Sequence, residues 1–245
     1  TASNICKSHV GRVSDLPTPD LCPMSLPRRT LPRGLLLVFE GIDGAGKTTQ
    51  VHLLAARLQQ EGYEVTCLKE PTDGPWGQQI RQLARHGREQ VSPATELEWF
   101  LQDRRDDVRH NIEPALARRQ IVLLDRYYFS TMAYQGALHG HVDDIRTHNE
   151  AFAPPPDLLL LFDIPPAQGL DRVQRRGVLS HYERLEYLER VAALFRAMSV
   201  TQFPYLRRLD AAGTIETVQA EIWRAVCALL HATGETITLQ EKTQP

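Results

Sequence analysis

The stretch GIDGAGKT at positions 41–48 has the composition of a phosphate-binding loop. It fits the pattern GxxxxGK[ST] at every fixed position, and it lies between an apolar run at 35–39 and a helical pattern at 48–60. Glycines let the backbone curl so that its N–H groups point at phosphate oxygens, and the following helix adds the positive end of its dipole. We therefore expect Lys47 to reach the β- and γ-phosphates of a nucleoside triphosphate and Thr48 to ligate Mg²⁺. The residues expected around this nucleotide are Gly41, Ile42, Asp43, Gly44, Ala45, Gly46, Lys47, Thr48 and Thr49.

A charged pair, Asp125 and Arg126, directly follows the apolar run at 121–124. In open α/β sheets, ligands bind outside the carboxyl ends of the strands, which places this pair beside the phosphate loop. A carboxylate there can orient Mg²⁺, so Thr48 and Asp125 are the expected metal ligands. A guanidinium can bridge the donor and acceptor phosphates and stabilise the charge of the transition state. We expect Lys47, Asp125 and Arg126 to act in phosphoryl transfer; the alternative is a surface ion pair at a strand end.

Short apolar runs alternate with longer helical patterns along the chain. The predicted strands are 35–39, 64–68, 121–124 and 158–162, with a weaker candidate at 205–209. The predicted helices are 48–60, 77–86, 94–117, 129–138, 166–176, 183–199 and 215–231. Strands that alternate with helices predict parallel βαβ units. The expected fold class is α/β, a three-layer sandwich with a five-stranded parallel sheet and a helical lid, in one domain at 34–233.

The two ends of the chain differ from its centre. Residues 1–33 contain several prolines and no helical or strand period, so we expect a disordered extension, with Met24 as a candidate native start. Residues 234–245 are expected to form a loose tail.

Charge and cysteine content argue against several classes of partner. The chain has 28 Lys and Arg against 30 Asp and Glu, a net charge of −2 at pH 7, which offers no basic surface to nucleic acid or a membrane. No apolar run approaches the roughly 18–20 residues that cross a bilayer. The spacing of the four cysteines fits neither zinc ligands nor a CxxC motif, and we expect Cys67 and Cys227 to be buried, reduced thiols. These features predict a cytoplasmic protein that binds neither nucleic acid nor membrane.

Four segments together resemble the thymidylate kinase family. They are FEGIDGAGKTTQ at 39–50, KEP at 69–71, DRYYFSTMAYQG at 125–136 and PDLLLLFDI at 156–164. The resemblance runs in order over about residues 35–230. It implies ATP-dependent phosphorylation of dTMP to dTDP, with ATP and Mg²⁺ as cofactors and a homodimer as the assembled form. Transfer is expected to be direct and in line, without a covalent intermediate.

The resemblance also implies which residues meet the acceptor. Asp43 resembles the acidic residue that contacts the acceptor's sugar and helps to place its phosphate. Phe100 and Arg104 resemble the pair that stacks on thymine and bonds an exocyclic carbonyl. Their spacing of four residues puts them on one helix face. The alternatives are core packing for Phe100 and a solvated ion-pair face for Arg104.

Four residues of the segment 125–136 are implied to complete the acceptor pocket. Ser130 and Thr131 are expected to face the edge of the base. Tyr134 resembles the residue packed under the deoxyribose, where a 2′-hydroxyl would clash, and Gln135 completes that wall. The alternative for Tyr134 is a place in the core.

The segment DRVQRRG at 171–177 resembles the lid that closes over ATP. Arg172, Arg175 and Arg176 are candidates to neutralise phosphate charge after the lid excludes water. The phosphate loop has Gly44 and Ala45 instead of a basic residue, which resembles the bacterial arrangement in which the lid supplies the arginine. The alternative is a solvated basic helix end, favoured by the helix dipole.

Two segments depart from the family's pattern. Residues 180–183 are SHYE where members usually have DRFE or a close variant, and residues 70–76 are EPTDGPW instead of the glycine-rich EPGGT type. Arg81 is our candidate for contact with the acceptor phosphate. The departures leave open a related kinase for UMP, CMP or a deoxynucleoside. A rival from another class is an ATP-binding regulator without kinase activity.

Overall fold

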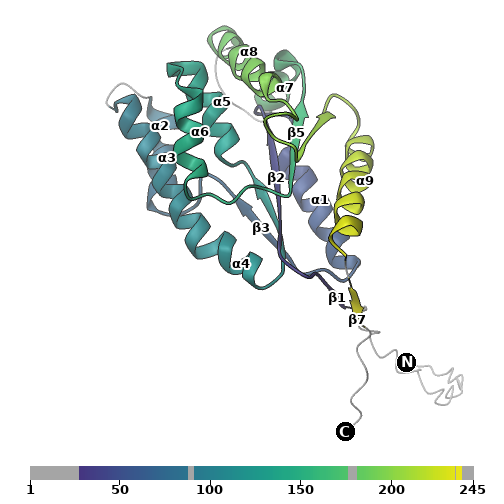
Figure 1. The fold of residues 1–245 in the computed structure, drawn as a ribbon. Helices are drawn as coiled ribbons and strands as arrows, with labels where there is room; N and C mark the ends of the chain where they lie inside the picture. The colour runs from purple at the N-terminus through teal and green to yellow at the C-terminus, as the bar shows by residue number, and fades with distance from the viewer. Residues whose placement is uncertain (1–27, 88–90, 176–180, 235, 239–245) are drawn as a thin grey trace, which may run out of the picture.

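The computed structural model describes residues 28–87, 91–175, 181–234 and 236–238 (Figure 1). Its centre is a five-stranded sheet in the order β3-β4-β2-β5-β6, in which every neighbouring pair is parallel. The strands are β2 (Leu35–Gly41), β3 (Val65–Lys69), β4 (Ile121–Asp125), β5 (Leu158–Asp163) and β6 (Leu206–Asp210). All five predicted apolar runs form strands, and the predicted parallel sheet is confirmed.

Burial explains why these runs form the middle of the sheet. Every residue of β2 and β4 is buried, as expected for parallel strands that are covered on both faces. The edge strand β6 is instead only partly buried, with Arg207 and Arg208 exposed between the buried Leu206 and Leu209. The pattern of β6 is correspondingly weaker in the sequence.

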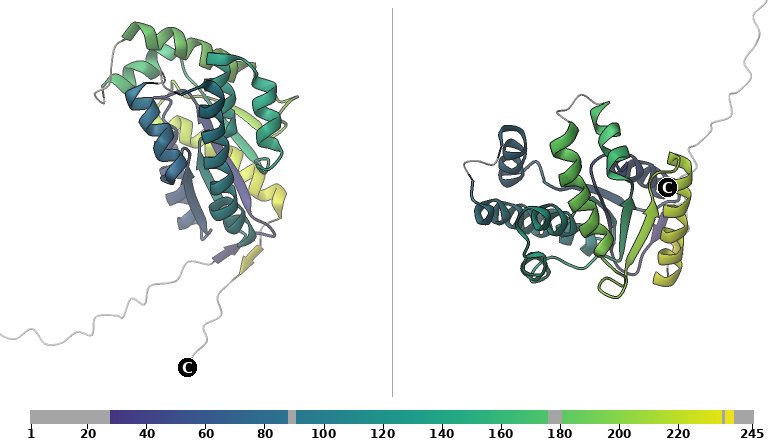
Figure 2. Two further views of the ribbon diagram at one scale, coloured as in Figure 1. Left: turned by 90° about the vertical axis from the view of Figure 1, so that its left-hand side faces the viewer. Right: turned by 90° about the horizontal axis from the view of Figure 1, so that it is seen from above.

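Helices cover both faces of the sheet and give the predicted three layers (Figure 1). One face is covered by α1 (Lys47–Gln60) and α9 (Ile215–Thr233). The other is covered by α4 (Glu113–Ala117), α5 (Tyr128–His139) and α8 (His181–Ala197). Seen from above, the strands separate α9 from the helices of the opposite layer (Figure 2, right).

Three further helices extend the layer around α5. They are α2 (Pro75–His86), α3 (Pro93–Asp107) and α6 (Val142–Glu150), with α3 and α6 packed on α5 and α2 packed on α3. A π-helical turn, η1 (Val108–Ile112), joins α3 to α4, so the single helix predicted at 94–117 is interrupted. The sequence patterns did not predict α6, because few of its residues are apolar.

A two-stranded sheet lies at the end of the molecule opposite α7 (Pro166–Gln174) and α8 (Figure 1). It pairs β1 (Arg28–Thr30) with β7 (Thr236–Thr238) in antiparallel register. These strands fall within the segments expected to be the extension and the tail, where three residues are too few to produce a period. Residues 1–27, 235 and 239–245 of these two segments lie outside the described residues.

The surface of the described chain corrects one prediction. Cys67 and Cys227 are free thiols, but both are exposed, so the prediction that they are buried is wrong. Cys67 lies on β3, which is at the edge of the described sheet, and Cys227 lies on the outer face of α9. None of the described helices combines the length and apolar character needed to cross a membrane.

Candidate active site

The phosphate loop connects the carboxyl end of β2 to the first turn of α1. Its backbone turns at Gly44 and Gly46, where φ is +80° and +92°, a region that residues with a Cβ rarely adopt. Gly46 directly precedes α1, so the unpaired N–H groups of the first helical turn face the loop. The predicted strand–loop–helix context is therefore present.

Lys47 is buried and folds back over the loop that precedes it. Its Nζ donates hydrogen bonds to the carbonyl oxygens of Gly41 and Ile42, both at 2.9 Å. Burial and the positive charge of Arg126 lower the pKa of Lys47 to about 8, against the pull of Asp43. Because negative charge favours the protonated amine, phosphate binding would raise this pKa again.

Thr48 and Asp125 meet where α1 begins and β4 ends. The Thr48 hydroxyl donates to Asp125 Oδ2 at 2.5 Å. Both residues line a cavity of about 300 Å³, together with Lys47, Lys69 and Arg126 among others. A hydroxyl and a carboxylate are hard oxygen ligands, of the kind that Mg²⁺ takes together with phosphate oxygens and waters. The donor set therefore fits Mg²⁺.

Arg126 follows β4 with a left-handed backbone, φ +76°, which is uncommon for a residue with a side chain. Its backbone N–H donates to the carbonyl oxygen of Phe39 at 3.0 Å, which ties the turn to β2. Its guanidinium bonds Asp43 Oδ1 at 2.7 Å and Ser130 Oγ at 2.8 Å. These contacts fix the positive charge at the cavity beside the phosphate loop.

Asp43 connects the phosphate loop to α5 through Tyr134. The Tyr134 hydroxyl accepts from the backbone N–H of Asp43 and donates to Asp43 Oδ2, both at 3.1 Å. Loss of water opposes ionisation of this carboxyl, but the charges of Arg126 and Lys47 lower the pKa of Asp43 to about 2. Tyr134 therefore lies directly beside the loop, and it also packs against the hydrophobic core.

Glu40, inside the apolar run of β2, organises the start of α5. Its buried carboxylate accepts from the backbone N–H groups of Tyr127 at 2.7 Å and Ser130 at 3.0 Å, and from the Ser130 hydroxyl at 2.6 Å. Burial raises the pKa of Glu40, in opposition to the charge of Arg126. Ser130 thus connects Glu40 to Arg126, and its predicted place at the edge of a base stays a prediction.

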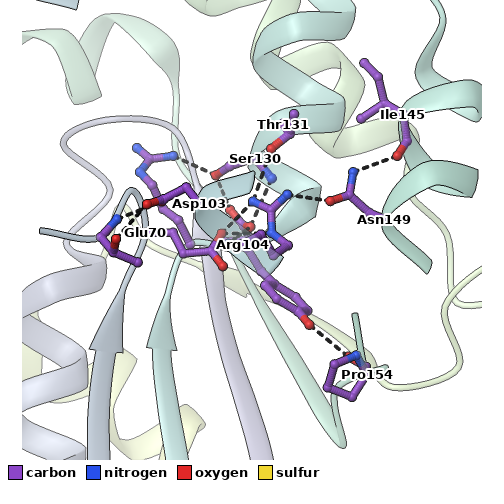
Figure 3. A network of polar contacts seen from close by, with 12 residues as sticks. Glu70, Asp103, Arg104, Ser130, Thr131, Ile145, Asn149 and Pro154 are labelled. Atoms are coloured by element: carbon purple, nitrogen blue, oxygen red, sulfur yellow. Dashed lines mark hydrogen bonds and ion pairs between the residues drawn. The ribbon is translucent and has the colours of Figure 1, made fainter. Parts of the chain in front are cut away.

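Arg104 is at the centre of a buried polar network (Figure 3). Its Nε and Nη2 donate to one oxygen of Glu70, Oε2, at 2.9 and 2.5 Å. Nη1 donates to Asn149 Oδ1 at 2.5 Å, and Nη2 also donates to Thr131 Oγ1 at 3.2 Å. Arg104 is 2% exposed, so the alternative of a solvated ion-pair face is wrong for it. Burial raises the pKa of Glu70 to about 8, in opposition to the charge of Arg104.

The turn after β3, which departs from the usual glycine-rich pattern, is held by side chains. Asp103 accepts from the backbone N–H of Thr72 at 2.8 Å and from its hydroxyl at 2.6 Å. Arg81 donates to the carbonyl oxygens of Pro71 and Thr72 and pairs with Asp73 at 3.0 Å. Arg81 therefore supports the turn that carries the chain from β3 to α2.

Comparison with known proteins decides between the kinase and regulator interpretations of this site. The family model described as thymidylate kinase matches residues 39–222. The chain belongs to the thymidylate kinase family. The thymidylate kinase of Xanthomonas campestris pv. campestris is 47% identical over 200 residues, which are 81% of this chain and 86% of that protein. The thymidylate kinase of Desulfotalea psychrophila is 46% identical over 199 residues, 80% of this chain and 96% of that protein.

The match confirms the family, the α/β kinase fold and the enzyme class predicted from the sequence, an ATP-dependent dTMP kinase. A thymidylate kinase of Xylella fastidiosa is 47% identical over 189 residues, 77% of this chain and 84% of that protein. The roles of individual residues remain predictions that the geometry either supports or revises.

The remaining predicted acceptor residues of this thymidylate kinase family member lie on α3 and α5. Phe100 is half-buried, one helical turn before Arg104, and is not among the described residues that form or border the hydrophobic core cluster. Gln135 is buried, and its Nε2 donates to Glu96 Oε1 at 2.8 Å across the contact of α5 with α3. Because Phe100 lies outside that cluster, the alternative that it is a core packing residue is not supported.

The lid candidate begins on α7 (Pro166–Gln174), which packs directly on the phosphate loop. A Cβ added to Gly44 would lie 2.1 Å from the carbonyl oxygen of Gly169, so the two backbones touch. Arg172 donates to the carbonyl oxygens of Gly44 at 3.4 Å and Ala211 at 3.2 Å. Arg175 is exposed and pairs with Asp171 at 2.9 Å. Arg176 and the side chains of the divergent segment 180–183 lie outside the described part of the structure.

A second cavity, of about 310 Å³, adjoins the phosphate loop on the side of α9. It is lined by Gly44, Ala45, Gly46, Thr49, Gln50, Arg172, Ala211, Gly213, Thr214, Ile215 and Val218. The part of this lining that follows β6 was not predictable from the sequence, because its small and apolar residues have no chemical signature. The places of Glu40 and Lys69 in the site were not predicted either, although an acidic residue inside a buried apolar run, as at Glu40, is a signal that the sequence offers.

Proposed function

We propose that this thymidylate kinase family member transfers the γ-phosphoryl group of MgATP directly and in line to the phosphate of dTMP. The reaction would take place at the cavity that Lys47, Thr48, Asp125 and Arg126 share. Mg²⁺, when bound by Thr48 and Asp125, supplies charge neutralisation of the phosphates. No protein nucleophile is required, because positioning and charge stabilisation suffice for phosphoryl transfer.

The placement of Arg126 is the observation that supports this proposal most strongly. Its guanidinium is fixed by Asp43 on the loop and by Ser130 on α5, and it borders the phosphate cavity. A cation held between the donor loop and the acceptor helix can bond oxygens of both phosphates as charge shifts between them. Arg172, which touches the loop carbonyl of Gly44, is the lid arginine best placed to add a second charge.

We propose that dTMP lies between α3 and α5, with its phosphate toward Arg126. Phe100 would stack on the base, and Arg104 and Thr131 would bond its edge. Tyr134 and Gln135 would line the sugar, beside Asp43. The hydrogen bonds between Tyr134 and Asp43 support this placement, because they join the sugar wall to the phosphate loop.

We also propose roles for the remaining predicted arginines, Arg81, Arg175 and Arg176. Arg81 would contact the acceptor phosphate by releasing Asp73, whose side chain is fully exposed. Arg175 and Arg176 would join Arg172 around ATP when the lid closes.

We further propose that the assembled form is a homodimer in the cytoplasm, an expectation that rests on family resemblance and composition. Light scattering on the purified chain tests the first part. A mass of twice 27.7 kDa is expected, and a mass of 27.7 kDa at all concentrations would refute it.

Arg126→Lys tests the catalytic part of the proposal. Lysine keeps the charge but cannot bridge two phosphates with a planar fork, so we expect kcat to fall about 10²–10³-fold. The KM values for dTMP and MgATP should change little. Arg105→Lys is the matched control, since Arg105 on α3 is exposed and pairs only loosely with Glu98, at 3.4 Å. A kcat within threefold of the parent enzyme would remove Arg126 from the chemistry.

A further inference from the structure

Asn149 is an amide that is completely enclosed by protein, at the C-terminal end of α6. Its Nδ2 donates to the carbonyl oxygen of Ile145 at 2.7 Å, and its Oδ1 accepts from Arg104 Nη1 at 2.5 Å (Figure 3). Only this orientation of the amide satisfies both neighbours, because the reverse would set the NH₂ group against the guanidinium. Asn149 therefore presents a fixed acceptor to Arg104.

Glu70 alone does not fix the orientation of the Arg104 guanidinium. Both bonds between them use the same carboxylate oxygen, Oε2, and Oε1 has no hydrogen-bond partner within the described chain. A guanidinium held at one oxygen can pivot about it, unlike one held by two parallel bonds. The bond to Thr131 is longer, at 3.2 Å. Asn149 is therefore the second anchor that stops the pivot.

The anchored guanidinium has one donor left. Arginine carries five N–H groups in a rigid plane. Among the described residues, Glu70, Thr131 and Asn149 accept four of them, which leaves the second N–H of Nη1. Because Asn149 holds the other N–H of this same nitrogen, it sets the direction of the remaining one.

We propose that Asn149 is a positioning residue that determines specificity for thymine over cytosine by aiming the last free N–H of Arg104 at the base. This inference rests on the proposed acceptor site between α3 and α5. Thymine and cytosine both carry a carbonyl at position 2, but only thymine has an acceptor at position 4, where cytosine has an amino group. A donor fixed in direction favours the carbonyl and opposes the amino group, whereas a donor free to turn away discriminates less.

The test compares kcat and KM for dTMP and dCMP in the full-length enzyme. Asn149→Leu has a similar size but no acceptor, and Asn149→Ala leaves room for a water and folds more readily. For both variants we expect the ratio of kcat/KM for dTMP over dCMP to fall, by about tenfold in Asn149→Leu. Most of the change should come from a higher KM for dTMP, with the KM for MgATP unchanged. Asn149→Asp keeps an acceptor at the same place and should retain most of the discrimination.

Ile145→Val is the matched control, because it removes a buried methyl group from the same helix and keeps the bond between Asn149 and Arg104. An unchanged dTMP:dCMP ratio in the Leu and Ala variants would overturn the inference. So would an equal loss of discrimination in Ile145→Val, since that would make the effect a general loosening of α6. A parent enzyme that shows no preference for dTMP over dCMP would instead refute the proposed acceptor site.

Discussion

Replacing Gly44 by alanine separates two demands on the phosphate loop, its backbone shape and its contact with α7. At Gly44 the φ angle is +80°, and a Cβ would lie 2.1 Å from the carbonyl oxygen of Gly169. At Gly46 the φ angle is +92°, and a Cβ would meet no described atom within 4 Å. Gly46→Ala is therefore the matched control, with similar backbone strain and no clash.

The expected losses of stability follow from these two geometries. A left-handed backbone costs an alanine about 1–2 kcal/mol at either position. The clash at Gly44 involves a backbone carbonyl, which cannot rotate away as a side chain would, and such overpacking costs about 1–3 kcal/mol more. We expect the free energy of unfolding to fall by about 2–5 kcal/mol in Gly44→Ala and by about 1–2 kcal/mol in Gly46→Ala.

Urea unfolding followed by circular dichroism measures the loss of unfolding free energy in each variant, provided that the slope of this free energy against urea concentration is the same in both. Gly46→Ala should still lose affinity for MgATP, because its methyl group would enter the cavities that Gly46 lines. Equal losses of stability in the two variants would refute the reasoning, since they would mean that α7 does not rest on the loop.

Two further predictions concern the phosphate and sugar sites. MgATP affinity should fall as the pH rises through about 8, by up to about tenfold per pH unit, because the free enzyme must protonate Lys47 when phosphate binds. Calorimetry in buffers of different ionisation enthalpy should detect proton uptake when MgATP binds, and Lys47→Arg should abolish this uptake. Proton uptake that persists in Lys47→Arg would show that a group other than Lys47 takes up the proton. Tyr134→Ala should lower the preference for dTMP over its ribonucleotide counterpart by about tenfold, measured as a ratio of kcat/KM. An unchanged ratio would exclude Tyr134 from sugar selection.

The central strands were predictable because burial on both faces demands uninterrupted apolar runs, as at 35–39 and 158–162. The helix α6 was not, because the residues it buries are Ile145 and the polar Asn149, and the rest of its sequence has no apolar period. The interruption at η1 was not predicted either, since a single π-helical turn inside a longer helix has no residue pattern of its own.

The residues of the candidate site also divide into those that the sequence predicts and those that it does not. Lys47 and Thr48 were predictable because the phosphate loop is one segment whose spacing carries the chemistry. Glu40, Glu70 and Asn149 act through contacts between distant segments, and nothing in their local sequence names the partner. Their role in holding Arg104 and Arg126 emerges only when the folded chain brings these segments against α3 and the end of β4.

Acceptor-dependent ADP release tests the central claim most directly. The enzyme would be given MgATP with dTMP, dUMP, UMP, CMP, dGMP, AMP or thymidine in turn, and ADP would be compared with phosphorylated product. We predict rapid turnover with dTMP, one ADP for each dTDP, and far slower turnover with the other acceptors. Turnover with a different acceptor that equals or exceeds the turnover with dTMP would contradict the account, and so would ADP release without any phosphorylated acceptor.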